Sequence, residues 1–163
     1  MKRIGSLRPV IWLLSHTLHH LDRLVLRWSN GRYATLTWFT GLPFLTLTTT
    51  GARSGQPHTV PLIGIPYNGQ IILIASNWGK PRSLAWYYNL KAHPTVTVAV
   101  GGETAVYTAH EAHGTERETC WQEAVAYYPA YETYQKGNGR LIPVMVLTVG
   151  KNPDPSISLG FSR

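Results

Sequence analysis

Residues that could bind an anionic, ring-bearing ligand are concentrated between Leu45 and Pro94, in two loops that each follow an apolar run. Both loops are rich in Gly, Ser and basic side chains, and loops of this kind on a rigid sheet can hold a long anion. The candidate ligand-binding residues are Gly51, Arg53, Ser54, Gly55, Gln56 and His58 in the first loop, and Ser76, Asn77, Trp78, Gly79, Lys80 and Arg82 in the second. The layout predicts a cofactor site.

The first loop has a specific way to bind a phosphate. A turn from Gly51 to Gly55 can aim consecutive backbone N–H groups at an anion. Arg53 adds a charge-assisted hydrogen bond, and Ser54 adds a hydroxyl. The same residues also suit a plain hairpin connection, so both interpretations stay open at this point.

Overall charge also favours an anionic partner. The 163 residues carry 15 Lys and Arg against eight Asp and Glu, a formal net charge of +7 with a pI near 9.8. A phosphorylated cofactor, a membrane surface and a nucleic acid all fit that charge. We expect no nucleic acid, because the aromatic residues do not alternate with Lys and Arg on a recognisable motif. The single cysteine, Cys120, excludes an internal disulfide and favours the cytoplasm.

The segment from Val10 to Trp28 has the spacing of an amphipathic helix. Apolar residues recur at three- and four-residue intervals, and arginines stand near both ends. Such a helix packs on its own domain or rests on an anionic membrane, so the inner face of the cell membrane is an alternative location. His16, His19 and His20 share one helical face without Cys or carboxylate neighbours, and we expect no metal.

Beyond Gly31 the apolar period changes to two, which predicts strands. Asn68-Gly69 signals a hairpin, and Thr115 with Glu118 predicts a capping box at a helix start. A second helix is expected over 83–93, and the apolar run Val144–Leu147 predicts a buried last strand. These elements indicate an α+β fold of mainly antiparallel strands closed into a small barrel. We expect three parts: a helix segment over 1–32, a barrel domain over 33–150 and a loose tail over 151–163.

A series of short motifs then carries a family resemblance. It comprises Thr48-Thr49-Thr50-Gly51, Arg53-Ser54-Gly55-Gln56-Pro57, Pro61-Leu62, Ala75-Ser76, Trp86-Tyr87 with Asn89-Leu90, and Tyr128-Pro129-x-Tyr131-x-x-Tyr134-Gln135. In order and spacing this series resembles the deazaflavin-dependent nitroreductase family over Leu45 to Leu147, about two thirds of the chain. Ala52 and His58 depart from it, because members often carry Arg there, and Leu84 stands where Pro is frequent.

The resemblance implies a split β-barrel related to barrels that bind flavin mononucleotide, and a bound 8-hydroxy-5-deazaflavin, coenzyme F-420. It implies an enzyme that transfers a hydride from the reduced coenzyme to a quinone-like or nitro acceptor. No protein nucleophile is needed for that chemistry, since the cofactor carries the hydride and the protein aligns the reactants. The resemblance also associates the N-terminal segment with membranes.

Residue roles follow from this resemblance. The deazaflavin ring would lie against Trp78, with Lys80 or Arg82 near its acidic tail. Pro61, Trp86 and Asn89 would complete the cofactor site. Tyr128, Tyr131 and Tyr134 would contact the acceptor, with a hydroxyl of Tyr131 or Tyr134 in the catalytic role.

A structural role for these aromatic residues stays open. So do a flavin mononucleotide or haem barrel and a non-catalytic carrier of an apolar ligand. Oligomeric state is left undetermined.

Overall fold

The structure, a computed structural model, describes residues 42–80 and 84–150. The expected helix over Val10–Trp28, the boundary near residue 33, the tail over 151–163 and Arg82 lie outside these ranges. In chain order the described elements are β1 (Phe44–Thr50), β2 (Pro57–Ile63), β3 (Ile65–Tyr67), β4 (Gln70–Ile74), η1 (Asn77–Gly79), α3 (Ala85–Ala92), β5 (Thr95–Val100), β6 (Glu103–Glu111), α4 (Gly114–Tyr127), α5 (Ala130–Asn138) and β7 (Val144–Val149).

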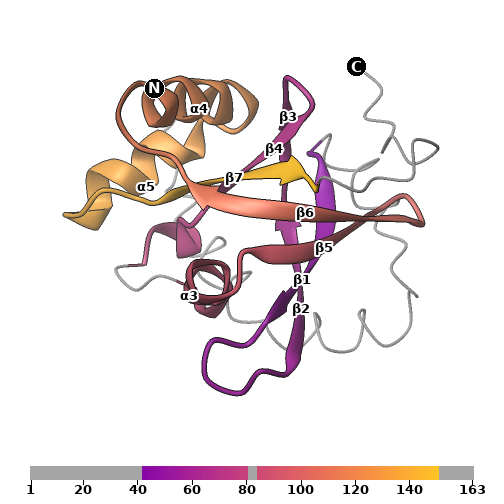
Figure 1. The fold of residues 1–163 in the computed structure, drawn as a ribbon. Coiled ribbons are helices and arrows are strands. Elements are labelled where there is room, and N and C mark those ends of the chain that lie inside the picture. The colour runs from indigo at the N-terminus through magenta and orange to yellow at the C-terminus, as the bar shows by residue number, and fades with distance from the viewer. Residues whose placement is uncertain (1–41, 81–83, 151–163) are drawn as a thin grey trace, which may run out of the picture.

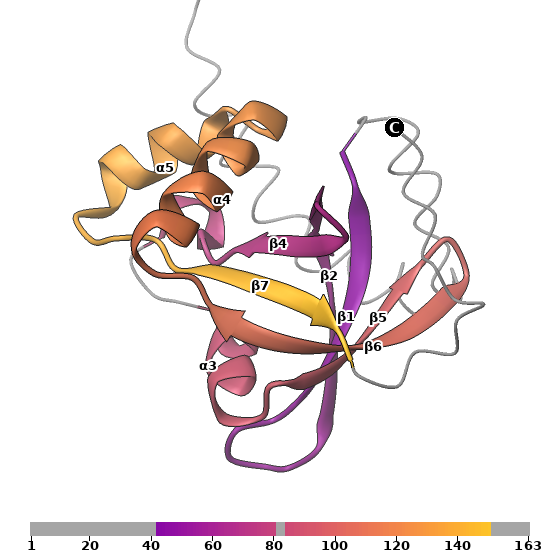
Figure 2. The ribbon, with the colours of Figure 1, turned by 45° about the horizontal axis from the view of Figure 1, so that its top comes forward.

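The strands form one seven-stranded antiparallel sheet in the order β2-β1-β5-β6-β7-β4-β3. This sheet is strongly curled, because β1 and β2 run across the direction of β6 and β7 in both views (Figures 1 and 2). Helices α4 and α5 lie together at one end of it, while α3 lies apart from them beside β1 and β6. The α+β, mainly antiparallel fold expected from the sequence is confirmed.

Two apolar clusters pack on opposite faces of the sheet. Ile71 and Leu73 of β4 point into the cluster that α3 covers, whereas Ile72 and Ile74 point into the cluster under α4 and α5. Successive side chains of a strand face opposite sides, so a strand buried on both sides must be apolar throughout. The same holds for β7, whose first four residues are all buried. This is why the run Val144–Leu147 is wholly apolar, as the sequence predicted.

The turns between strands also follow local sequence. Asn68 and Gly69 join β3 to β4 with φ values of 48° and 74°, the left-handed conformation that an Asn-Gly hairpin turn requires. The predicted capping box is wrong. Helix α4 begins at Gly114, with His113 as its N-cap and no side-chain cap, so Thr115 already lies inside the first turn.

Edge strand β2 contains two prolines, Pro57 and Pro61, which lie opposite Thr50 and Thr46 of β1. Proline has no N–H to donate, and sheets tolerate it mainly at their edges. The strand leads from the turn after β1 to Pro61, Leu62 and Ile63, which line the pocket described below, whereas the second predicted loop follows β4.

Candidate functional site

The turn between β1 and β2 is held by its own hydrogen bonds. Gly51 N–H donates to Gln56 O at 2.8 Å, Gly55 N–H donates to Gly51 O at 2.9 Å, and Gln56 N–H donates to Ser54 Oγ at 3.2 Å. Gly55 has a φ of 66°, which favours glycine. Among the described residues only the amides of Arg53 and Ser54 donate no hydrogen bond within this turn. The predicted row of N–H groups is therefore reduced to those two.

Asn89 of α3 fastens this turn to the sheet. Its Oδ1 accepts a hydrogen bond from Ala52 N–H at 2.9 Å, and its Nδ2 donates to Thr49 Oγ1 at 3.0 Å. The side chain is buried, where an unpaired amide would be costly. The sequence assigned Asn89 to cofactor contact. In the structure its amide hydrogen-bonds to the protein on both sides, so Asn89 holds the turn in position, and its contact with a cofactor stays a prediction.

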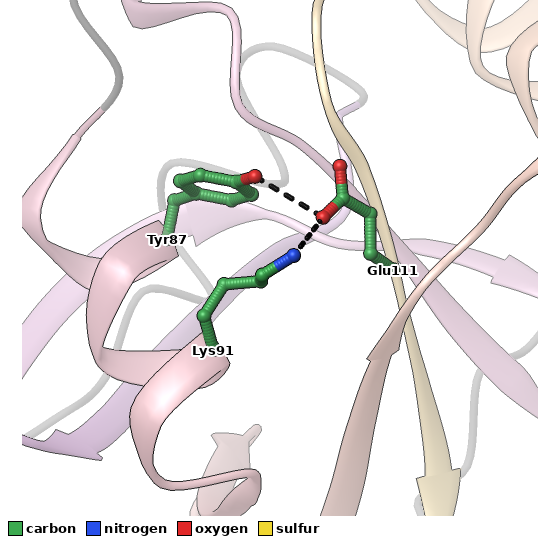
Figure 3. A network of polar contacts seen from close by, with 3 residues as sticks. All are labelled: Tyr87, Lys91 and Glu111. Carbon is green, nitrogen blue, oxygen red and sulfur yellow. Dashed lines mark hydrogen bonds and ion pairs between the residues drawn. The ribbon is translucent and has the colours of Figure 1, made fainter.

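Helix α3 is in turn fastened to the end of β6. Tyr87 and Lys91 point from one side of α3 to Glu111, whose Oε2 accepts hydrogen bonds from Tyr87 Oη at 3.1 Å and Lys91 Nζ at 2.6 Å (Figure 3). Burial alone would raise the pKa of Glu111. The hydrogen bonds from Lys91 and Tyr87 outweigh burial and hold that pKa below its ordinary value. The carboxylate thus stays ionised and anchors the helix.

The second loop adopts a left-handed turn. Asn77, Trp78 and Gly79 have φ values of 46°, 56° and 80°, a conformation that side-chain-bearing residues rarely adopt in succession. Gly79 N–H donates to Ser76 O and Lys80 N–H donates to Asn77 O. From α5, Asn138 Nδ2 donates to Lys80 O at 3.3 Å.

An apolar pocket opens beside this turn, and we call it the aromatic pocket. It is lined by Phe44, Pro61, Leu62, Ile63, Leu73, Ile74, Ser76, Asn77, Trp78, Leu84, Trp86, Tyr128, Tyr131 and Tyr134. Its walls come from β1, β2, β4, η1, α3 and the region of α5, so the curl of the sheet creates it. Eight of the predicted site residues meet here: Pro61, Ser76, Asn77, Trp78, Trp86, Tyr128, Tyr131 and Tyr134.

Three tyrosines form one wall of the aromatic pocket. The rings of Tyr128 and Tyr131 meet edge to face at 5.1 Å between centroids, and Tyr128 Oη lies 3.3 Å from Tyr134 Oη. Burial raises the pKa of Tyr131 well above its ordinary value, and the neighbouring tyrosines add to this. Burial and the hydrogen bond to Tyr128 do the same for Tyr134. Both phenols therefore keep their protons at physiological pH and can act as hydrogen-bond donors.

Trp86 contributes an unused donor. It is only 4% exposed, and its Nε1 is buried without a hydrogen bond to any described residue. A buried indole N–H usually finds an acceptor. Because Trp86 lines the aromatic pocket, a ligand oxygen or nitrogen could supply that acceptor.

Helix α3 and strand β2 connect the turn to the aromatic pocket. Trp86 and Asn89 are three residues apart on α3, hence on one helical face, with Trp86 at the pocket and Asn89 at the turn. Along β2, Pro57 to Pro61 spans about 13 Å at the usual rise per residue. A ligand with an anionic tail and a planar ring could thus follow the hairpin from the turn into the pocket.

The remaining predicted residues lie around this path. Gly51, Arg53, Ser54, Gly55 and Gln56 belong to the turn, and His58 belongs to the start of β2. None of them lines the pocket, and Ser54 Oγ lies 3.2 Å from His58 Nε2. Gly79 contacts Tyr134, and Lys80 is held through its carbonyl by Asn138. Sequence reasoning missed the aliphatic and phenylalanine wall: Phe44, Leu62, Ile63, Leu73, Ile74 and Leu84. Their residue types are those of any core, so only the fold reveals their role.

The curled antiparallel sheet defines a protein of the split-barrel type, with an apolar pocket lined by aromatic residues. A family model described as F420H(2)-dependent quinone reductase matches residues 22–149. The chain belongs to this family. The expected enzyme class, a deazaflavin-dependent reductase, is confirmed, and the family favours the deazaflavin over the flavin mononucleotide alternative.

Individual relatives agree. The chain is 37% identical over 144 residues to the F420H(2)-dependent quinone reductase Rv1261c of Mycobacterium tuberculosis H37Rv, covering 84% of this chain and 95% of the relative. A solved F420-H2 dependent reductase, FDR-A, is 44% identical with a TM-score of 0.61, covering 64% of this chain and 93% of that one. A solved domain-swapped dimer is 37% identical, also with a TM-score of 0.61, covering 85% of this chain and 98% of that one.

Proposed function

We propose that this protein transfers a hydride from reduced coenzyme F-420 to a quinone-like acceptor bound in the aromatic pocket. The observation that carries this proposal is the joining of a basic, polar turn to an apolar, tyrosine-walled pocket along one face of α3. That arrangement suits a cofactor with an acidic tail and a planar ring. The names of the relatives support the same reaction.

The residues present fit such a cofactor. Arg53 and the amides of Arg53 and Ser54 would bind the acidic tail, and the unpaired Nε1 of Trp86 would donate to an acceptor atom of the ring. Ser76 and Asn77 line the pocket just after the end of β4 and would meet the polar edge of the ring. When bound, the reduced deazaflavin supplies the hydride. The protein aligns the two rings and keeps water from the apolar pocket.

Acceptor reduction places negative charge on an oxygen atom, and the tyrosines can stabilise it. Because their pKa values are raised by burial, Tyr131 and Tyr134 are weak acids. We therefore assign them hydrogen bonding to the developing oxyanion. The hydroquinone anion that hydride addition produces takes up its proton from solvent when it leaves the pocket. A nitro acceptor is also planar and carries acceptor oxygens, so we propose that it occupies the same pocket.

Titration and turnover test this function. Binding of F-420 should quench fluorescence in a titration. F-420 should also bind more tightly than flavin mononucleotide. Reduced F-420 should then be oxidised on addition of 2-methyl-1,4-naphthoquinone, and more slowly on addition of a nitroarene. Tighter binding of flavin mononucleotide, or no oxidation with any quinone, would refute the proposal.

We further propose an anionic membrane surface as a partner. Residues 1–41 contain six Lys and Arg and one Asp, whereas the described residues contain six of each charge. The excess positive charge thus lies wholly outside the described residues. Within the described ranges, no helix has the length and apolar character needed to cross a bilayer. Co-sedimentation with phosphatidylserine vesicles should fall with salt and with deletion of residues 1–30. Equal sedimentation of both proteins would contradict this.

A further inference from the structure

Trp78 is an exposed aromatic residue on a strained backbone. Its φ of 56° and ψ of 32° place it in the left-handed region, directly after Asn77 in the same region. Its side chain is 60% exposed although it lines an apolar pocket. Strain of this kind persists only where surrounding structure enforces it, and it is often associated with function. A large exposed ring at a pocket mouth is a candidate ligand contact.

Helix α5 enforces this conformation. Gly79, with a φ of 80°, lies so close to Tyr134 that an added Cβ would stand 3.1 Å from Tyr134 Cδ1. One turn later along α5, Asn138 holds the carbonyl of Lys80. The residues on both sides of this turn are therefore fixed to the helix that carries Tyr131 and Tyr134. Trp78 is positioned relative to these tyrosines before any ligand binds.

We propose that Trp78 determines acceptor specificity, by stacking its indole on the planar ring of the acceptor in the aromatic pocket. This inference rests on the proposed function and deepens it. The sequence placed Trp78 against the deazaflavin. In the structure η1, which carries Trp78, packs on α5, the helix of Tyr131 and Tyr134, and the neighbouring Gly79 lies against Tyr134. Its place beside the tyrosines favours the acceptor side.

Stacking on Trp78 should favour large, electron-poor rings. The indole is an electron-rich surface, quinones are electron-poor, and offset stacking increases with the area of overlap. A fused naphthoquinone covers more of the indole than a single-ring benzoquinone does. Trp78 should therefore raise the preference for naphthoquinone over benzoquinone, and it should leave binding of the cofactor nearly unchanged.

Three variants test this on the full chain. Trp78→Leu removes the aromatic face but keeps an apolar side chain, Trp78→Phe keeps a smaller aromatic face, and Tyr88→Leu is a matched control. Tyr88 is 55% exposed and does not line the aromatic pocket. For each protein we would measure the Kd of F-420 and the kcat/KM for 2-methyl-1,4-naphthoquinone and for 1,4-benzoquinone.

For Trp78→Leu we expect the kcat/KM ratio of naphthoquinone to benzoquinone to fall about 3- to 10-fold, chiefly through the KM for naphthoquinone. Trp78→Phe should recover most of that ratio, and Tyr88→Leu should match the parent. Equal losses with both quinones would overturn the inference, as would a Kd for F-420 that rises as much as the KM. If the parent oxidises reduced F-420 with neither quinone, the proposed function itself fails, a result distinct from either of these.

Discussion

The two ends of the candidate site are held in place by different forces. The turn from Gly51 to Gln56 is exposed and polar, and hydrogen bonds to its own backbone and to Asn89 fix its shape. The aromatic pocket is fixed by apolar packing, with Trp86 in one core cluster and Tyr128, Tyr131 and Tyr134 in or against the other. Hydrogen bonds and charges orient a ligand, and the strength of charge contacts changes with salt. Apolar packing depends instead on how well the shape of the ligand fits the pocket. Perturbations at the two ends should therefore separate affinity for the cofactor from turnover of the acceptor.

The largest effect is expected at the tyrosine wall. Tyr134→Phe removes only the hydroxyl, so turnover with a quinone should fall by roughly 10²-fold if that group stabilises the acceptor oxygen. The Kd of F-420 should stay near the parent value. Steady-state kinetics with saturating reduced cofactor measure this, with Tyr127→Phe, an exposed tyrosine outside the pocket, as control. If Tyr131→Phe and Tyr134→Phe both match the parent, the tyrosines are structural.

At the polar end, Arg53→Ala should leave the fold intact and raise the Kd of F-420 by roughly 10- to 100-fold at low salt. High salt should shrink that difference, because the lost contact is between opposite charges near water. Lys136→Ala, a similarly exposed change on α5, should do nothing. Salt-independent or absent effects of Arg53→Ala would reduce the turn to a hairpin connection. The rate of hydride transfer at saturation should not change, in contrast to Tyr134→Phe.

Asn89 allows a sharper test of the polar end, since both ends of its amide hydrogen-bond to the protein and hold the turn. Asn89→Ala leaves Ala52 N–H and Thr49 Oγ1 without their partner, which should cost about 1–3 kcal/mol of stability. The Kd of F-420 should also rise, and less so when Arg53 is already Ala. Denaturant unfolding and titration of the double-mutant cycle measure both. Strict additivity of the two changes in binding would contradict the positioning role.

The smallest effect is expected at Glu111, which anchors α3 between the two ends. Glu111→Gln should lower the Tm by about 2–4 °C near pH 7. Because the folded pKa of Glu111 lies below its ordinary value of 4.5, its contribution is present above that value. The difference should vanish as pH falls through the folded pKa. It should also fade at high pH, when Lys91 and Tyr87 lose their protons, and their raised pKa values place that loss above their ordinary values of 10.5 and 10.0. Thermal melts across pH test this, and a pH-independent difference would contradict it.

Sequence alone predicted the elements that local rules determine. Alternation and apolar runs located β4 and β7, and Asn68-Gly69 located a hairpin turn. The capping prediction failed because a cap depends on a single position: the N-cap of α4 is His113, and Thr115 lies two residues beyond it. The chemistry-bearing residues of the site could be proposed because Arg, Trp and Tyr carry a chemical signal.

The sequence could not predict how the residues of the site are arranged in space. Leu62 and Leu73 line the pocket only because the sheet curls, and nothing in their residue type separates them from the core. Likewise, Asn89 matched a family motif, but only the structure shows both ends of its amide engaged within the protein. The left-handed conformation of Trp78 was also beyond prediction, since propensity disfavours it and contacts from α5, distant in sequence, enforce it.

The prolines of β2 have a consequence for how copies of this protein meet in a crowded cell. A strand approaching the outer edge of β2 would find two donors missing, at Pro57 and Pro61, from any ladder it tried to build. Uncontrolled growth of the sheet from molecule to molecule, the route to fibrils, is thereby disfavoured at this edge. The hairpin that presents the turn to a ligand is thus also protected against aggregation.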